Sequence, residues 1–242
     1  LSVDGCEFLR GVATLPTKLF GTNCYGKNSL TIEVEYSEVV RVYTLDVLLI
    51  TKKINSLTEF QKDVTIKWAG DRILGYYALD ADIDFNYYEI SVWATDWNYD
   101  NGFRGTLDGR GYSLKNVKST FYGITAQMGV GAVVKNLVIP NLKYSGGETT
   151  LFTRGASGVT FDTIEITLSD DSACSQGTNP INCGLLIDHV MKNCTFKNIT
   201  INAHGKDLQK IFGGKNEHRN TSVYENIVIY AKSVTYYEND IT

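Results

Sequence analysis

The sequence predicts an all-β chain whose larger part is a parallel β-solenoid with about five rungs. Four segments repeat one pattern of apolar and polar residues: VVKNLVI (133–139), TFDTIEI (160–166), TFKNITI (195–201) and VYENIVI (223–229). Equivalent positions are 27, 35 and 28 residues apart (137 to 164, 164 to 199, 199 to 227). Repeats at such spacings form stacked units that cannot bury their apolar side alone. An earlier segment, YSLKNVK (112–118), fits the same columns and is the expected first rung.

A small polar residue precedes the second apolar position of each rung. Strict strand alternation would place it and the following aliphatic residue on opposite faces. A bend at this position, which Asn tolerates, would let both point inward. Stacked amides can then bond along the column. The expected structural ladder consists of Asn116, Asn136, Asn198 and Asn226.

Composition excludes several classes of partner. Apolar residues make up 43% of the 242, which supports a substantial core. The net charge is −4 and no Lys/Arg cluster occurs, so nucleic acid and anionic membranes are not expected partners. No run of about 20 apolar residues is present, so we expect no membrane insertion. The chain begins at Leu1 without a leader, and we expect it to be part of a longer multidomain chain.

Two domains are predicted. Residues 1–51 contain alternating strand patterns separated by Gly/Asn turns, which favours a small, partial β-sandwich. Residues 52–242 form the solenoid. Ser56 and Glu59 have capping-box spacing and predict a short helix over about 57–62, placed to cover the open end of the first coil.

The five cysteines leave the redox state open. Cys174 and Cys183 flank a polar insertion (168–183) and are one candidate disulfide. The second candidate pair is Cys6 with Cys24. Cys194 falls on the inward side of its rung and is expected to be a free core thiol. The odd count and irregular spacing argue against a zinc site.

The segments ahead of the rungs carry a family resemblance. ILGYYALDADIDFN (73–86) is followed by a Trp-containing loop and then by GTLDGRGYSL (105–114). This order, with residues 75–85 and 103–114 as matching motifs, resembles the start of right-handed parallel β-helix modules of large bacterial surface proteins, which carry GLUG-type and pectate-lyase-like repeats. The part before residue 52 is similar to the bacterial Ig-like domains that precede such modules. The resemblance implies a right-handed β-helix, an extracellular, cell-wall or cell-surface location, and adhesion or polysaccharide handling.

Three carboxylates alternate with apolar residues in the predicted strand 79–85: Asp80, Asp82 and Asp84. They therefore project from one face. One interpretation is a calcium site, which needs six to eight oxygen ligands, usually from more than one segment. The other is that the carboxylates accept backbone N–H groups or are solvated. No other cofactor is expected.

The most aromatic stretch of the chain follows this strand. Its candidate glycan-binding residues are Tyr87, Tyr88, Trp93, Trp97 and Tyr99. Sugar C–H surfaces stack on aromatic rings, and exposed Trp and Tyr also suit protein interfaces. The competing interpretation is that the tryptophans pack over the first coil.

No residue is assigned a catalytic role. The segment GTLDG (105–109) is typical of a turn. The outward positions of the rungs hold Lys135, Asp162, Lys197 and Glu225, so no carboxylate ladder forms. We therefore expect a non-catalytic extracellular surface module for adhesion or carbohydrate binding, whose partner is a glycan or a host or cell-surface protein. Two alternatives stay open: a β-helix lyase or glycoside hydrolase that degrades polysaccharide, and a structural spacer.

Overall fold

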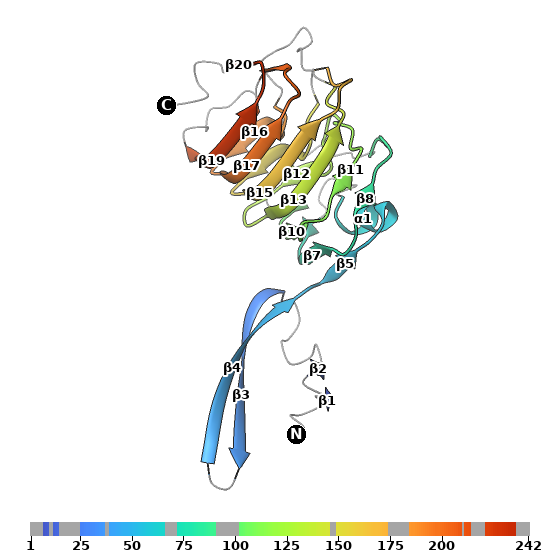
Figure 1. Cartoon of the computed structure of the whole chain (residues 1–242). Helices are drawn as coiled ribbons and strands as arrows, with labels where there is room; N and C mark the ends of the chain where they lie inside the picture. Colours follow the sequence, from blue (N-terminus) through green and yellow to red (C-terminus); the bar gives the residue numbers. More distant parts are fainter. Residues whose placement is uncertain are drawn as a thin grey trace. The chain divides into compact units, whose positions relative to one another are not determined.

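The chain divides into two compact units, Leu1–Thr51 and Lys52–Thr242. The computed structural model describes residues 7–9, 12–14, 25–36, 39–65, 72–90, 102–145, 149–173, 184–209, 211–213 and 221–235. The described residues are all-β apart from one short helix (Figure 1).

The first unit contains two antiparallel strand pairs. One is β1 (Glu7–Leu9) with β2 (Val12–Thr14), and the other is β3 (Gly26–Tyr36) with β4 (Val39–Leu49). The β3–β4 pair is a long ribbon in unbroken register (Figure 1). The sandwich and its likeness to an Ig domain stay predictions.

The second unit is a parallel β-solenoid of about five turns, which confirms the predicted fold class. Its main sheet has seven strands in the order β19-β17-β15-β13-β10-β7-β5. These strands are β5 (Lys52–Ile54), β7 (Tyr76–Leu79), β10 (Thr106–Asp108), β13 (Val133–Leu142), β15 (Thr160–Leu168), β17 (Thr195–Asn202) and β19 (Val223–Tyr230). Figure 1 shows strands β13, β15, β17 and β19 stacked side by side.

Further parallel sheets complete the coils. The second sheet consists of β6 (Arg72–Ile73), β9 (Gly102–Phe103), β12 (Gln127–Met128), β14 (Thr153–Ser157) and β16 (Ile187–Lys192). Two-stranded pairs are formed by β8 (Ile83–Asp84) with β11 (Leu114–Lys115), and by β18 (Asp207–Gln209) with β20 (Ser233–Thr235). Because parallel pairing aligns equivalent residues of successive coils, each coil covers the apolar side of its neighbour.

The repeat columns coincide with the observed register. Phe161 pairs with Phe196, and Phe196 pairs with Tyr224. Their rings stack with centroids 5.2 and 5.3 Å apart and planes within 6° of parallel. Phe161 and Phe196 are fully buried in the hydrophobic core cluster formed by the described residues of this unit.

The polar residue of each rung does bend the strand, but its side chain points outward. Asn136, Asn198 and Asn226 have φ of 52°, 52° and 54°, and Thr163 has 56°. Asn198 is exposed, so the expectation of an inward amide column was wrong. The left-handed residue adds a second outward position in succession, which brings the next aliphatic residue back to the core.

The segment 112–118 is not the first rung. Strand β10 occupies the position before β13 in the sheet, with Leu107 opposite Val134 in parallel register, and β7 and β5 precede it. Gly105, which precedes β10, is required because the coils stack closely there and not because the chain turns. A Cβ at Gly105 would lie 2.4 Å from the carbonyl oxygen of Gly75 on the preceding coil. Residues 112–118 follow the bend of the same coil and contact the later part of β13.

The predicted helix is α1 (Leu57–Asp63), and it covers the first coil. The Glu59 N–H donates to Ser56 Oγ at 3.3 Å, and the Asn55 N–H donates to Glu59 Oε2 at 3.0 Å, which completes the capping box. Phe60 is fully buried and meets Phe85 edge to face, 5.4 Å between centroids. The helix thus closes the N-terminal end of the solenoid core.

Candidate functional site

A shallow groove crosses the outer side of the seven-stranded sheet, where its strands bend. Its volume is about 530 Å³, within the range of ligand sites. It is lined by Arg110, Gly111, Asn136, Leu137, Val138, Thr163, Ile164, Glu165, Asn198 and Thr200. Because the left-handed residues lie at the same place in successive rungs, they align their amide and hydroxyl groups along it.

The amides of the expected ladder bond between coils, although not as one continuous row. Asn226 Nδ2 donates to Asn198 Oδ1 at 3.0 Å, and Asn198 Nδ2 donates to Asp162 Oδ1 at 2.9 Å. Thr163 takes the next position and bonds Asp162 instead.

The amides of the earlier coils bond aspartates. Asn136 Nδ2 donates to Asp108 Oδ1 at 3.0 Å, and Asn116 Nδ2 donates to Asp84 Oδ1 at 2.9 Å. Asn116 belongs to the segment after the bend, so it lies outside the column formed by Asn136, Thr163 and Asn198. Each of these amides therefore ties its own coil to the preceding one.

Asp108 is the most buried carboxylate beside the groove, with a relative exposure of 6%. It accepts hydrogen bonds from the Tyr76 hydroxyl, from Asn136 and from the backbone N–H of Arg110, and Lys135 Nζ lies 3.5 Å away. Burial acts to raise the pKa of Asp108, but these bonds outweigh it and lower the pKa. Burial and the bond to Asp108 raise the pKa of Tyr76. This arrangement keeps a charged carboxylate saturated with donors, as a structural anchor requires.

The three aspartates proposed for calcium have different protein partners. Asp80 pairs with Lys53 at 3.2 Å and with Arg110 at 2.9 Å. Asp82 pairs with Lys115 at 2.7 Å.

Backbone donors reach two of the same carboxylates. Asp82 accepts the Ser113 N–H at 2.8 Å, and Asp84 accepts the Asn86 N–H at 2.7 Å. Among the residues that the structure describes, no group of three or more His, Cys, Asp or Glu side chains could hold a metal. The geometry favours the interpretation in which the carboxylates bond backbone and side-chain donors.

Only part of the aromatic stretch lies in the described chain. Tyr87 and Tyr88 are exposed, at 38% and 54%. Asn86 and Tyr87 are consecutive left-handed residues, with φ of 46° and 55°, which is uncommon for an aromatic residue. Lys143 Nζ lies 5.7 Å from the Tyr87 ring centroid. Trp93, Trp97 and Tyr99 fall outside the described residues.

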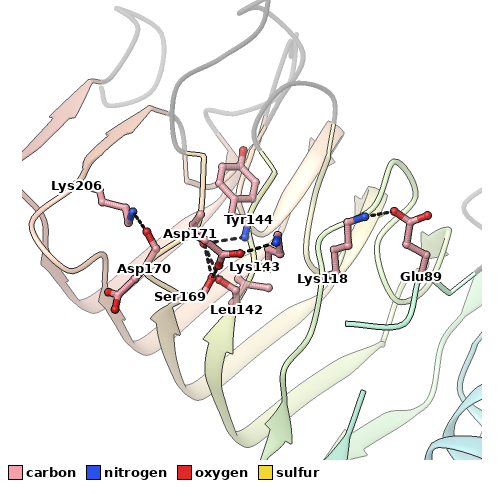
Figure 2. A network of polar contacts seen from close by, with 10 residues as sticks. Glu89, Lys118, Leu142, Lys143, Tyr144, Ser169, Asp170, Asp171 and Lys206 are labelled. Carbon is pink, nitrogen blue, oxygen red and sulfur yellow. Dashed lines mark hydrogen bonds and ion pairs between the residues drawn. The ribbon is translucent and has the colours of Figure 1, made fainter. Parts of the chain in front are cut away.

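A polar network joins the coils on the side that carries Lys118 and Lys143 (Figure 2). Lys118 bonds Glu89 of the preceding coil, and Lys143 bonds Asp171 of the following one. The bonds to partners hold the pKa of Asp171 below its ordinary value, chiefly through Lys143. The start of the polar insertion is therefore fixed to its neighbour.

Ser172 extends this attachment into the core. Its Oγ accepts the Tyr144 N–H at 2.9 Å and donates to the Leu142 carbonyl at 2.8 Å. The acidic residues at the beginning of the insertion thus support packing between coils.

Of the cysteines, only Cys194 lies in the described residues. It is a buried free thiol, and burial raises its pKa to about 11, which leaves it unreactive. The candidate disulfides Cys174–Cys183 and Cys6–Cys24 fall outside the described residues. No helix in the part of the chain that the structure describes is long and apolar enough to cross a membrane.

Sequence reasoning missed the groove because it treated the outward positions of the rungs as a single row. The bend residue is itself a second outward residue, next to the first, and it contributes to the lining of the groove. The signal was present in the repeat itself, where the bend position is always Asn or Thr. No family model matches this chain, and neither a curated protein nor a solved structure matches it with significant similarity.

Proposed function

We propose that this chain is a non-catalytic surface module that binds an extended carbohydrate along the groove. The observation that carries the proposal is the alignment of amide and hydroxyl groups from successive coils, Asn136, Thr163 and Asn198, with the Thr200 hydroxyl beside them on the same strand as Asn198. Such uncharged groups donate and accept hydrogen bonds as sugar hydroxyls require. Arg110, the one cationic side chain among the described residues of the lining, is held by Asp80.

The spacing of the lining supports an elongated ligand. Neighbouring strands of a sheet are about 4.8 Å apart, so equivalent groups recur at that interval along the groove. This interval is close to the length of one sugar residue in an extended polysaccharide. The proposal includes the extracellular, cell-surface location and membership of a longer multidomain chain.

A second contact region is proposed at Tyr87 and Tyr88. Their exposed rings are held by the left-handed backbone at Asn86 and Tyr87, and the Tyr87 N–H donates to the Asn116 carbonyl at 2.8 Å. An aromatic ring fixed in this way offers a flat face for a sugar or for a protein partner. The observation favours adhesion by either kind of partner at this region.

The test is retention of the purified chain on insoluble polysaccharides, together with analysis of released products. Thr200→Arg would place a bulky cation in the groove and is expected to reduce retention by about tenfold or more. Val130→Arg adds the same side chain at an exposed turn outside the groove and is the matched control.

The outcomes separate the alternatives. Retention lost in Tyr88→Ser but kept in Thr200→Arg would move the binding site to the tyrosines. Release of shortened products would identify a polysaccharide-degrading enzyme instead. Failure to bind any polysaccharide would contradict the proposal and favour a spacer or a protein-binding adhesin.

A further inference from the structure

Strand β19 is the last strand of the seven-stranded sheet. It pairs with β17 on one side, and in the described chain no strand pairs with its other side. Tyr224 is 40% exposed, whereas Phe196 at the equivalent position of β17 is fully buried. Ile227 and Ile229 are likewise only partly buried. The opposite end of the core is covered by α1, so the two ends of the solenoid differ.

Two columns reach this edge with a geometry that another strand would continue. The stacked rings of Phe161, Phe196 and Tyr224 are evenly spaced, so an aromatic residue is the type that continues this column. Asn226 donates its amide to Asn198 on the preceding rung. If the hydrogen bonds continue in the same direction along the column, Asn226 Oδ1 is the acceptor for the side-chain amide of an Asn on the next strand.

A third column specifies charge. In the register of the sheet, five outward neighbours follow one another: Asp108, Lys135, Asp162, Lys197 and Glu225. Their charges alternate without exception, and Lys197 Nζ lies 3.3 Å from Glu225 Oε2. Like charges directly opposite each other destabilise a sheet, whereas opposite charges stabilise it. The column ends on a carboxylate, so the complementary residue is Lys or Arg.

We propose that the edge of β19 is a docking site for a parallel β-strand of a partner polypeptide. The partner strand should carry, in order, an aromatic residue, Lys or Arg, Asn, an aliphatic residue, any residue and a second aliphatic residue. Residues 196–201 of this chain, FKNITI, have this pattern and already occupy the same position beside β15. Strand addition at an open edge supplies main-chain hydrogen bonds, and the side-chain columns supply the specificity.

A second copy of this chain fits the edge poorly. Its lysine-bearing rungs, β13 and β17, are paired on both sides within the sheet. The other edge strand of the sheet is β5. Lys52 of β5 is in register with Tyr77, and Tyr77 is in register with Leu107 of β10. If β5 of a second copy paired with β19, it would therefore place a lysine in the aromatic column. The helix α1, which follows β5, covers the core at that end.

The probe is a blocked peptide with the sequence of residues 195–202, TFKNITIN, titrated into the whole chain. We expect saturable binding and slower amide exchange in β19. The same peptide with Glu in place of its Lys should bind about fivefold more weakly, as expected for one exposed ion pair. Glu225→Lys in the protein should reverse this preference.

Glu33→Lys is the matched control, because it makes the same charge change at an exposed position of the first unit. It should leave the preference for the Lys peptide unchanged. Binding no stronger than that of a scrambled peptide, or a preference that Glu225→Lys does not reverse, would overturn the proposal. A dimer in sedimentation experiments without peptide, with β19 protected, would also overturn it in favour of a second copy.

Discussion

At the scale of single residues, the backbone conformation at the bend decides which residue types fit. Asn adopts a left-handed φ with little strain, whereas a β-branched residue rarely does. Thr163 is the exception in the column, with φ of 56° and a side chain that bonds the adjacent Asp162. It marks a local weakness in an otherwise consistent repeat.

Thr163→Asn is therefore expected to stabilise the solenoid by about 1 kcal/mol, because it removes a strained β-branched residue and supplies an amide between Asn136 and Asn198. Urea unfolding monitored by circular dichroism measures the change. Thr200→Asn is the control, since Thr200 faces outward on the adjacent rung without a left-handed φ. An equal gain in both variants would show that the bend conformation is not the cause.

At the scale of an element, α1 shows how a short helix is stabilised by its cap and its packing. Seven residues are too few for a stable isolated helix, so its stability depends on its cap and on burial of Phe60. Ser56 satisfies one of the free N–H groups at its start. The cap is thus coupled to closure of the core beneath it.

Ser56→Ala should lower the free energy of unfolding by about 1 kcal/mol, because the Glu59 N–H loses its side-chain acceptor. The shift in the urea midpoint at constant m value gives the measurement. Thr58→Ala also removes a hydroxyl, but at an exposed position within the helix, and should have almost no effect. If the two variants were equally destabilised, the capping interaction would not be the source.

At the scale of the whole solenoid, polar contacts connect each coil to the next. Bonds to Lys, Asn, Ser, Tyr or backbone donors lower the pKa of five aspartates below the ordinary 3.8: Asp82, Asp84, Asp108, Asp171 and Asp207. Asp108 is the most buried of them. These carboxylates favour the folded state only while they are ionised.

The free energy of unfolding should consequently be constant above about pH 5. It should fall as the pH drops through 3.8, the ordinary pKa, and continue to fall below it, where the lowered pKa values of the folded state lie. The sign follows from the unfolded chain, which binds protons first as the pH decreases. Free energies of unfolding from urea titrations between pH 7 and about pH 2.5 test this. Asp108→Asn should reduce stability at pH 7 and reduce the loss on acidification. Unchanged stability down to about pH 3 would contradict it.

The sequence alone was sufficient for the solenoid, its parallel register and its capping helix, because these depend on periodicity and on local capping chemistry. The repeat of Phe161, Phe196 and Tyr224 identifies a stacked column before any coordinate is known. The same reasoning misplaced residues 112–118 as a rung and read β10 as a turn. A strand of three residues between glycines has no periodicity of its own, and only its neighbours identify it.

The tertiary structure alone decided which way the bend residues face and what the carboxylates contact. A left-handed residue changes the alternation by one position, so the direction of Asn198 depends on a backbone angle that residue type permits but does not impose. Asp80 and Asp82 lie in one strand pattern, yet they pair with Arg110 and Lys115 about 30 residues away (80 to 110, 82 to 115). Local patterns specify how a coil forms, whereas a surface shared by several coils exists only after they have stacked.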